Sequence, residues 1–190
     1  QNIIPVNAEK IAYGKTETKK GITNVINAVL NTYHYASLPE LNAILKQYNV
    51  VADRGKEEGR IYKYRGLVYR ILDSNGNKIG VPVKASSINS QPTLARLEKL
   101  FVENEAKKEL LNKSVKEKLD EVLAQKPASM KELEKLLEQK RIYTVRRQNT
   151  EGRIYGITFV DNQYKVVFNG SDLGKAYTAA HLQNSLGAVA

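Results

Sequence analysis

The spacing of apolar residues divides the chain into helical segments and shorter segments typical of strands. In residues 18–33, 37–47 and 129–139, apolar side chains recur at the spacing of one face of an amphipathic helix. Short β-prone runs follow the last two of these helices. The runs after the first are residues 49–54, 66–73 and 78–83, and those after the second are residues 141–146, 152–161 and 164–168. The pattern predicts an α+β fold.

The same capping sequence opens both of these helices. Ser37 and Glu40 form a Ser-x-x-Glu box at the start of one, and Ser129 and Glu132 form it at the start of the other. In such a box each side chain accepts a hydrogen bond from a free backbone N–H at the helix start. The two boxes lie 92 residues apart, and the first β-prone runs match at the same offset. This regular offset predicts an internal duplication.

The pentapeptide Glu-Gly-Arg-Ile-Tyr occurs twice, at residues 58–62 and 151–155, and it allows two alignments of the copies. A direct alignment of the pentapeptides needs almost no gap up to that point, but it breaks the strands that follow. We instead align residues 66–69 with 152–155, because the next strand and turn then agree. On this alignment residues 55–65 are an insertion in the loop before the middle strand of the first copy.

Turn residues support the predicted strands. Asn75-Gly76 between two β-prone runs predicts a hairpin with a type I′ turn, since both residues tolerate positive φ angles. Asp161-Asn162 marks the corresponding turn in the second copy. After the third strand, residues 84–88 parallel residues 169–173, and residues 178–186 read as a short helix closed by Gly187.

A long helical segment connects the copies. Pro92 suits a first helical turn. A third Ser-x-x-Glu pair, Ser114 and Glu117, leaves open a pair of helices with a break near Asn112. We therefore predict two tandem modules, each a helix plus a three-stranded antiparallel sheet, joined by this segment. The predicted divisions are an N-terminal linker and helix (1–36), the first module (37–91), the connecting helix or helix pair (92–126) and the second module with a C-terminal helix (127–190).

Composition narrows the class of protein. The chain has 190 residues, of which 42% are hydrophobic, which is enough for a packed core. It has no apolar run of the roughly 20 residues that span a membrane, no signal-peptide pattern and no Cys, so we expect a cytoplasmic location. It starts with Gln1 and its only Met is Met130, so we expect a piece of a longer protein.

The sequence offers little catalytic chemistry. The only histidines, His34 and His181, show no metal-ligand spacing, and a Ser-His-Asp arrangement cannot be built from so few. There is no phosphate-binding glycine loop. We read the 11 tyrosines as packing or stacking residues, because no activating base or metal accompanies them. We therefore expect no catalytic residue, metal, cofactor or small-molecule substrate in this segment.

Charge points to a polyanion. The net charge is +10, from 30 basic and 20 acidic residues. Such an excess is typical of nucleic-acid-binding proteins, although it also occurs in proteins with no polyanion partner. Cations bind phosphates and aromatic rings stack on bases. The candidate DNA-binding residues, where basic and aromatic side chains mix, are Arg54, Arg60, Tyr62, Lys63, Tyr64, Arg65, Arg70, Arg146, Arg147 and Arg153.

Residues 38–55, 66–88 and 152–179 together resemble the region that follows the nuclease domain in bacterial relaxases of mobilisable and conjugative elements. Related relaxases also carry a strand followed by Ser-x-Leu-Gly and x-x-Tyr-Thr, which reads here as residues 171–178. The resemblance implies that the parent protein nicks one DNA strand at a transfer origin, using a Tyr nucleophile and a His-rich metal site. That His cluster is missing from this chain, so no catalytic residue carries over.

Two functions from different classes follow. The first is an accessory, non-catalytic DNA-binding module of a relaxase in plasmid or transposon mobilisation, which contacts single-stranded or duplex DNA near a transfer origin in the bacterial cytoplasm. The second is a structural module that binds other mobilisation proteins, for relaxosome assembly or contact with the coupling protein. Salt-dependent DNA binding favours the first, and tight binding to a mobilisation protein without DNA affinity favours the second.

Overall fold

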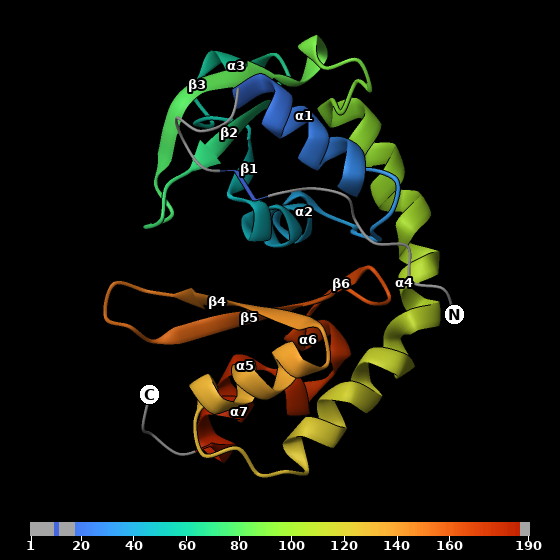
Figure 1. Ribbon diagram of the computed structural model, residues 1–190, viewed down its shortest axis with the longest axis vertical. Coiled ribbons are helices and arrows are strands. Elements are labelled where there is room, and N and C mark those ends of the chain that lie inside the picture. Colours follow the sequence, from blue (N-terminus) through green and yellow to red (C-terminus); the bar gives the residue numbers. More distant parts are fainter. Residues whose placement is uncertain (1–9, 12–17, 187–190) are drawn as a thin grey trace. The chain divides into compact units, whose positions relative to one another are not determined.

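The structure is a computed structural model that describes residues 10–11 and 18–186 (Figure 1). In these residues seven α-helices accompany two separate three-stranded antiparallel sheets, with strand orders β1-β2-β3 and β4-β5-β6. The predicted α+β class with two tandem modules is confirmed. The chain divides into two compact units, residues 1–105 (unit 1) and 106–190 (unit 2).

Unit 1 packs two helices against one face of its sheet. The helix α1 contacts β2, and α2 contacts β1. Val50, Tyr69 and Ile71 of the sheet are fully buried there, because their side chains share the face toward the helices. The elements are α1 (Thr18–Val29), α2 (Leu38–Leu45), β1 (Val50–Asp53), α3 (Arg60–Lys63), β2 (Val68–Leu72), β3 (Lys78–Lys84) and the start of α4 (Leu94–Leu123). Short 3-10 turns at Lys46–Tyr48 and Ala85–Ser87 follow α2 and β3.

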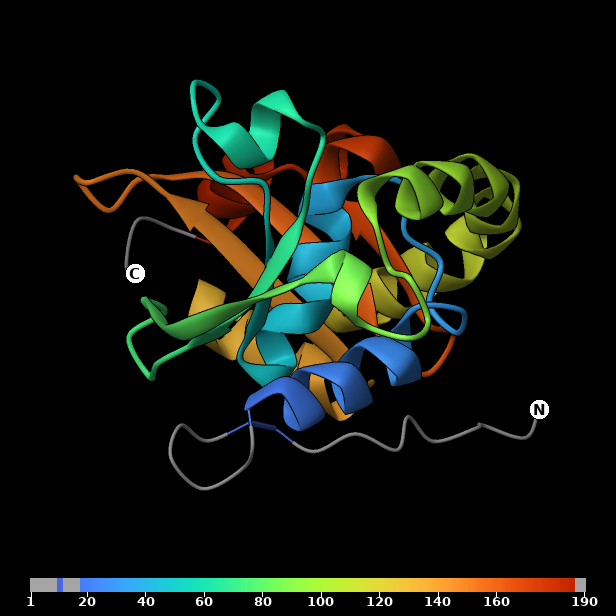
Figure 2. The same cartoon turned by 90° about the horizontal axis from the view of Figure 1, so that it is seen from above.

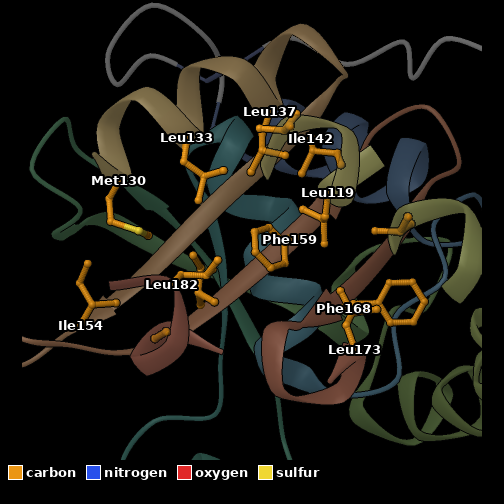
Figure 3. Close-up of a cluster of buried hydrophobic side chains, with 14 of the residues drawn as sticks. Leu119, Met130, Leu133, Leu137, Ile142, Ile154, Phe159, Phe168, Leu173 and Leu182 are labelled. Atoms are coloured by element: carbon orange, nitrogen blue, oxygen red, sulfur yellow. The ribbon is translucent and has the colours of Figure 1, made fainter. Parts of the chain in front are cut away.

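Unit 2 has its own hydrophobic core, shown in Figure 3. Phe159 of the central strand contributes to it with Leu119 of α4, Leu133 and Leu137 of the next helix and Leu182 of the last. The elements are the second half of α4, α5 (Met130–Gln139), β4 (Ile142–Gln148), β5 (Ile154–Asp161), β6 (Val166–Asn169), α6 (Gly170–Leu173), a 3-10 turn (Lys175–Tyr177) and α7 (Ala179–Ser185). The predicted stop at Gly187 lies outside the described residues.

The connecting segment is one continuous helix, so the alternative of two helices with a break near Asn112 is wrong. The helix α4 runs through Asn112 and Ser114 without interruption. Residues 106–123 contain no Gly or Pro, and charged and Leu residues that favour helices surround Ser114. Its first half buries Leu97 in unit 1, and its second half supplies Leu119 to the core of unit 2.

Local hydrogen bonds repeat between the units, as the duplication predicts. Ser37 Oγ accepts a hydrogen bond from Glu40 N (3.3 Å), and Ser129 Oγ accepts one from Glu132 N (3.1 Å). Each Glu carboxylate in turn accepts a hydrogen bond from the backbone N–H that precedes the capping serine. Both capping boxes are therefore formed, and each leads into a helix followed by three antiparallel strands.

The predicted alignment of the middle strands is wrong by four residues. Ile71 lies opposite Val50 and Asp161 lies opposite Ile142, so position 71 corresponds to 161. Counting back along both strands, Gly66 corresponds to Gly156 rather than to Gly152. The pairing equates buried Tyr69 with buried Phe159, whereas the sequence alignment had matched Tyr69 with Tyr155, which is 66% exposed. The eleven residues 55–65 therefore replace the nine residues 147–155 and are not a long insertion.

The two pentapeptides lie in corresponding segments and have different conformations. The first copy forms the start of α3, which includes Arg60–Tyr62. The second copy closes the β4–β5 hairpin and enters β5 at Ile154. The two copies thus occupy corresponding connections between the first and middle strands, and the first connection is two residues longer.

The turn between β2 and β3 is not type I′. A type I′ turn requires positive φ angles at both central residues. Gly76 has a φ of 83°, but the φ of Asn75 is not positive. The Asp73 carboxylate accepts hydrogen bonds from the backbone N of Asn75 and of Asn77, both at 2.9 Å. This side-chain cap favours a type I turn followed by a glycine in the left-handed region. The β4–β5 turn at residues 149–153 repeats the arrangement, with Asn149 in place of Asp73 and Gly152 at a φ of 82°.

Candidate nucleic-acid interface

Residues 54–66, which we name the α3 loop, form a closed excursion between β1 and β2. They lie at the end of the sheet opposite the β2–β3 turn (Figure 2). Asp53 accepts a hydrogen bond from the backbone N of Gly55 (2.8 Å) at its start, and Gly66 N donates to the Ile61 carbonyl (2.7 Å) at its end. Arg65 has a φ of 55°, which reverses the chain after α3. These contacts close the loop at both ends and position α3 and its side chains.

A pocket of about 600 Å³ lies beside the α3 loop. Tyr64 lines it and is 70% exposed, which is unusual for so large an aromatic side chain. The pocket is lined by residues from the loop, the start of β2, the end of β3 with the turn that follows it, and the start of α4. These residues are Arg60, Ile61, Tyr64, Arg65, Gly66, Leu67, Val68, Lys84, Ala85, Ser86, Thr93 and Leu94. Its walls therefore combine apolar surface with three cationic side chains.

The cations around Tyr64 differ in whether they form an ion pair with a carboxylate. Arg60, Lys63 and Lys84 are exposed, and none of them forms an ion pair in the part of the chain that the structure describes. The Lys63 ammonium lies 5.9 Å from the centroid of the Tyr64 ring. Arg65 instead forms an exposed ion pair with Glu98 of α4. Two of these exposed cations, Arg60 and Lys84, thus line the pocket, Lys63 lies beside the Tyr64 ring, and Arg65 is shared with a carboxylate.

The pair Arg54 and Tyr62 stabilises the base of the loop. The Arg54 guanidinium lies 3.9 Å from the centroid of the Tyr62 ring, within the range of a cation–π contact. It also donates a long hydrogen bond to the Tyr62 carbonyl (3.5 Å). Because the guanidinium covers one face of the half-buried Tyr62 ring, Tyr64 is the ring in this loop that is open for stacking.

Arg70 belongs to a polar cluster on the face of the sheet away from α1 and α2. Its guanidinium donates to the Gly80 carbonyl (3.4 Å), and the neighbouring Asp53 pairs with Lys78 (2.9 Å). Burial alone raises the pKa of Asp53, but the Lys78 ammonium and the Gly55 amide outweigh it and hold that pKa below its usual value. The cluster links the three strands of the sheet.

The predicted residues of unit 2 have different surroundings. Arg146 forms a bidentate ion pair with Glu134 of α5, and this hydrogen bonding raises the pKa of Arg146. The Arg147 guanidinium lies directly over Gly156, in space that a Cβ there would occupy. Arg153 is exposed near the tip of the β4–β5 hairpin.

The structure therefore assembles part of the predicted set. The α3 loop gathers Arg54, Arg60, Tyr62, Lys63, Tyr64 and Arg65, whereas Arg70 lies on β2 and Arg146, Arg147 and Arg153 belong to unit 2. Sequence reasoning missed Lys84 and Glu98. No local motif marks either residue, because each reaches the pocket or the loop from an element that is distant in sequence.

Two large tyrosines are structural. The Tyr35 hydroxyl donates to the Leu30 carbonyl (2.8 Å), and the Tyr69 hydroxyl donates to the Pro92 carbonyl (2.7 Å). Burial raises the pKa of both tyrosines.

Among the described residues there is no group of three or more His, Asp or Glu side chains that could hold a metal ion. No described helix combines the length and the apolar character needed to cross a membrane.

Comparison of the chain with protein-family models, with curated proteins and with solved structures finds no match.

Proposed function

We propose that this chain binds single-stranded DNA on the α3 loop. The observation that carries the proposal is the 70% exposed Tyr64, which lines a pocket together with Arg60 and Lys84 and has Lys63 beside its ring. Among the described residues none of these three cations forms an ion pair. An exposed tyrosine ring offers a stacking surface to a base of any identity, and the cations bind the adjoining phosphates. Stacking on Tyr64 requires an unpaired base, since the faces of bases in a duplex are already covered.

We further propose that the chain is an accessory, non-catalytic module of a relaxase that acts in plasmid or transposon mobilisation. Its support is the resemblance of residues 38–55, 66–88 and 152–179 to the region after the relaxase nuclease domain. The resemblance implies that the parent protein nicks one DNA strand at a transfer origin, and a module with a stacking tyrosine and nearby cations is suited to hold a displaced single strand.

A protein-interaction module is the second candidate. The helix α4 exposes two large apolar side chains, Val102 at 73% and Leu110 at 83%. Exposed apolar side chains of this size occur in surfaces that bind other proteins, although single ones are common on any protein. The DNA-binding proposal rests on a pocket with convergent cations as well, and for this reason we place it first.

The test is a titration of labelled single-stranded and duplex oligonucleotides with the full chain, followed by fluorescence anisotropy at about 50 and 200 mM salt. We expect the double variant Arg60→Ala, Lys63→Ala to bind single strands more weakly, with a slope of log affinity against log salt shallower by about 1.4, or about 0.7 per phosphate contact. We expect Tyr64→Ala to lose about 1–3 kcal/mol of binding free energy with little change in slope.

The control variant removes the same charge elsewhere. Lys131 and Lys135 are exposed residues of α5. The double variant Lys131→Ala, Lys135→Ala should have the same affinity for single strands, and the same slope of log affinity against log salt, as the unmodified chain. If both double variants weaken binding equally, net charge rather than the α3 loop binds the DNA. If the unmodified chain binds no DNA at the lower salt concentration, the protein-interaction function replaces this proposal.

A further inference from the structure

The trailing helices of the two units start in the same way, which extends the duplication beyond the sheets. Thr93 Oγ1 accepts a hydrogen bond from Arg96 N (3.4 Å) at the start of α4, and Thr178 Oγ1 accepts one from His181 N (3.2 Å) at the start of α7. The offset of 85 residues is also the offset between β3 and β6, since Val83 pairs with Tyr69 as Phe168 pairs with Phe159.

At this offset Glu98 of α4 corresponds to Gln183 of α7, and each side chain contacts the chain close to the start of the middle strand. Glu98 accepts from Arg65 in unit 1. Gln183 Nε2 donates to the Ile154 carbonyl in unit 2 (2.8 Å). In each unit a side chain from the first turns of the trailing helix therefore contacts the chain near the start of the middle strand, just before β2 in unit 1 and at the first residue of β5 in unit 2. The α3 loop and the tip of the β4–β5 hairpin are equivalent places in the fold.

A second pocket, of about 460 Å³, lies at this equivalent place in unit 2. Its lining residues come from the hairpin tip and from α7, and they are Asn149, Arg153, Ile154, Tyr155, Ala180, Gln183 and Asn184. Tyr155 is 66% exposed, close to the 70% of Tyr64. Tyr62 is the residue that matches Tyr155 in the pentapeptide, but Arg54 covers its ring, and Tyr64 takes the exposed position in unit 1.

We propose that this hairpin-tip pocket is a second site for single-stranded DNA, so that the chain carries one site in each unit. Tyr155 stacks on a base, and the exposed Arg153 beside it binds a phosphate. The side chain of Asn184 also lines the pocket and supplies an amide that can hydrogen-bond a base edge, whereas the Asn149 side-chain oxygen caps the hairpin turn. This inference rests on the proposed function. It adds that one chain binds two segments of single-stranded DNA.

The two sites differ in charge. Arg60, Arg65 and Lys84 line the pocket at the α3 loop, whereas among the described residues Arg153 alone is a cation that lines the hairpin-tip pocket. The neighbouring Glu151 in the turn is exposed and opposes a phosphate. The hairpin-tip site therefore binds more weakly than the α3 loop, and its affinity depends less on salt because it releases fewer counterions.

The experiment is calorimetric titration of the full chain with an oligothymidylate of about six nucleotides, a length within the site sizes of single-strand-binding folds. We expect two binding events per chain. Tyr155→Ala should weaken the lower-affinity event by about 5- to 150-fold and leave the other unchanged, whereas Tyr64→Ala should do the reverse. Tyr155→Phe, which keeps the stacking ring, should retain both events.

The outcomes separate this inference from the proposed function. One binding event that Tyr64→Ala weakens and Tyr155→Ala does not would overturn the second site and leave the α3 loop as the DNA site. No binding by the unmodified chain would overturn both. Because the Tyr155 side chain is largely exposed, its replacement should not unfold unit 2, and an unchanged thermal melt of the variant confirms this.

Discussion

The ion pair between Arg65 and Glu98 occupies a cation of the α3 loop, so the proposed DNA site predicts that breaking this pair strengthens DNA binding. Both side chains are exposed, at 63% for Arg65 and 48% for Glu98. A pair this exposed contributes about 0–1 kcal/mol to stability, so Glu98→Gln should cost no more than that in the free energy of unfolding. The substitution keeps the size of the side chain and frees the Arg65 guanidinium for a phosphate.

One additional phosphate contact on a single strand steepens the slope of log affinity against log salt by about 0.7. A rise from about 50 to 200 mM salt is fourfold, so the Glu98→Gln variant should lose about 2.6-fold more affinity over that rise than the wild type. Its affinity should exceed that of the wild type at the lower salt concentration. Fluorescence anisotropy with a labelled single strand at several salt concentrations gives both quantities.

The matched control is Glu105→Gln, which removes the same charge from an exposed position about 10 Å further along α4. It should leave the slope unchanged. A Glu98→Gln variant with the slope and affinity of the wild type would refute the argument that Arg65 contributes to the DNA site. An equal gain in both variants would assign the effect to net charge.

Three predictions concern unit 2. Gly170→Ala should lower the free energy of unfolding in urea by about 1–3 kcal/mol or more, because the new Cβ overlaps the Tyr177 carbonyl oxygen, and a change within experimental error would contradict this packing. Burial and the hydrogen bond to Asp120 (2.7 Å) raise the pKa of Tyr177 to about 12. Its contribution to stability is therefore complete below about pH 10 and is lost as the pH rises toward 12, so denaturation at several alkaline pH values should show a decline that Tyr177→Phe reduces. Arg146→Ala should cost about 1–2 kcal/mol of stability, because it leaves the half-buried Glu134 carboxylate unpaired, while DNA affinity measured by anisotropy stays close to that of the wild type.

Local sequence determined the helices and the duplication. The Ser-x-x-Glu boxes at Ser37 and Ser129 satisfy backbone donors within one turn of chain, so their structure follows from residues that are neighbours in sequence. The apolar spacing of the helices is local in the same sense. The offset of 92 residues between the boxes was therefore sufficient to predict two modules of one fold.

Two features depended on partners distant in sequence: the alignment of the middle strands, and whether each cation forms an ion pair. Gly66 matches Gly156 because of the ladders that β2 and β5 form with their neighbours, and Gly-x-x-Tyr in the second pentapeptide gave a stronger local match in the wrong place. Arg65 is paired with a residue 33 positions away, which no local pattern shows.

The repeated pentapeptide shows most directly what the sequence leaves open. In unit 2, β4 continues to Gln148, which lies opposite Ile154, so the second copy finds strand partners for its backbone. In unit 1, β1 ends at Asp53, whose carboxylate binds the Gly55 amide and Lys78, and the first copy has no strand beside it. Its backbone satisfies its hydrogen bonds internally, as the short helix α3. Five identical residues thus form a helix in one unit and enter a strand in the other, because the tertiary structure decides where their backbone hydrogen bonds are made.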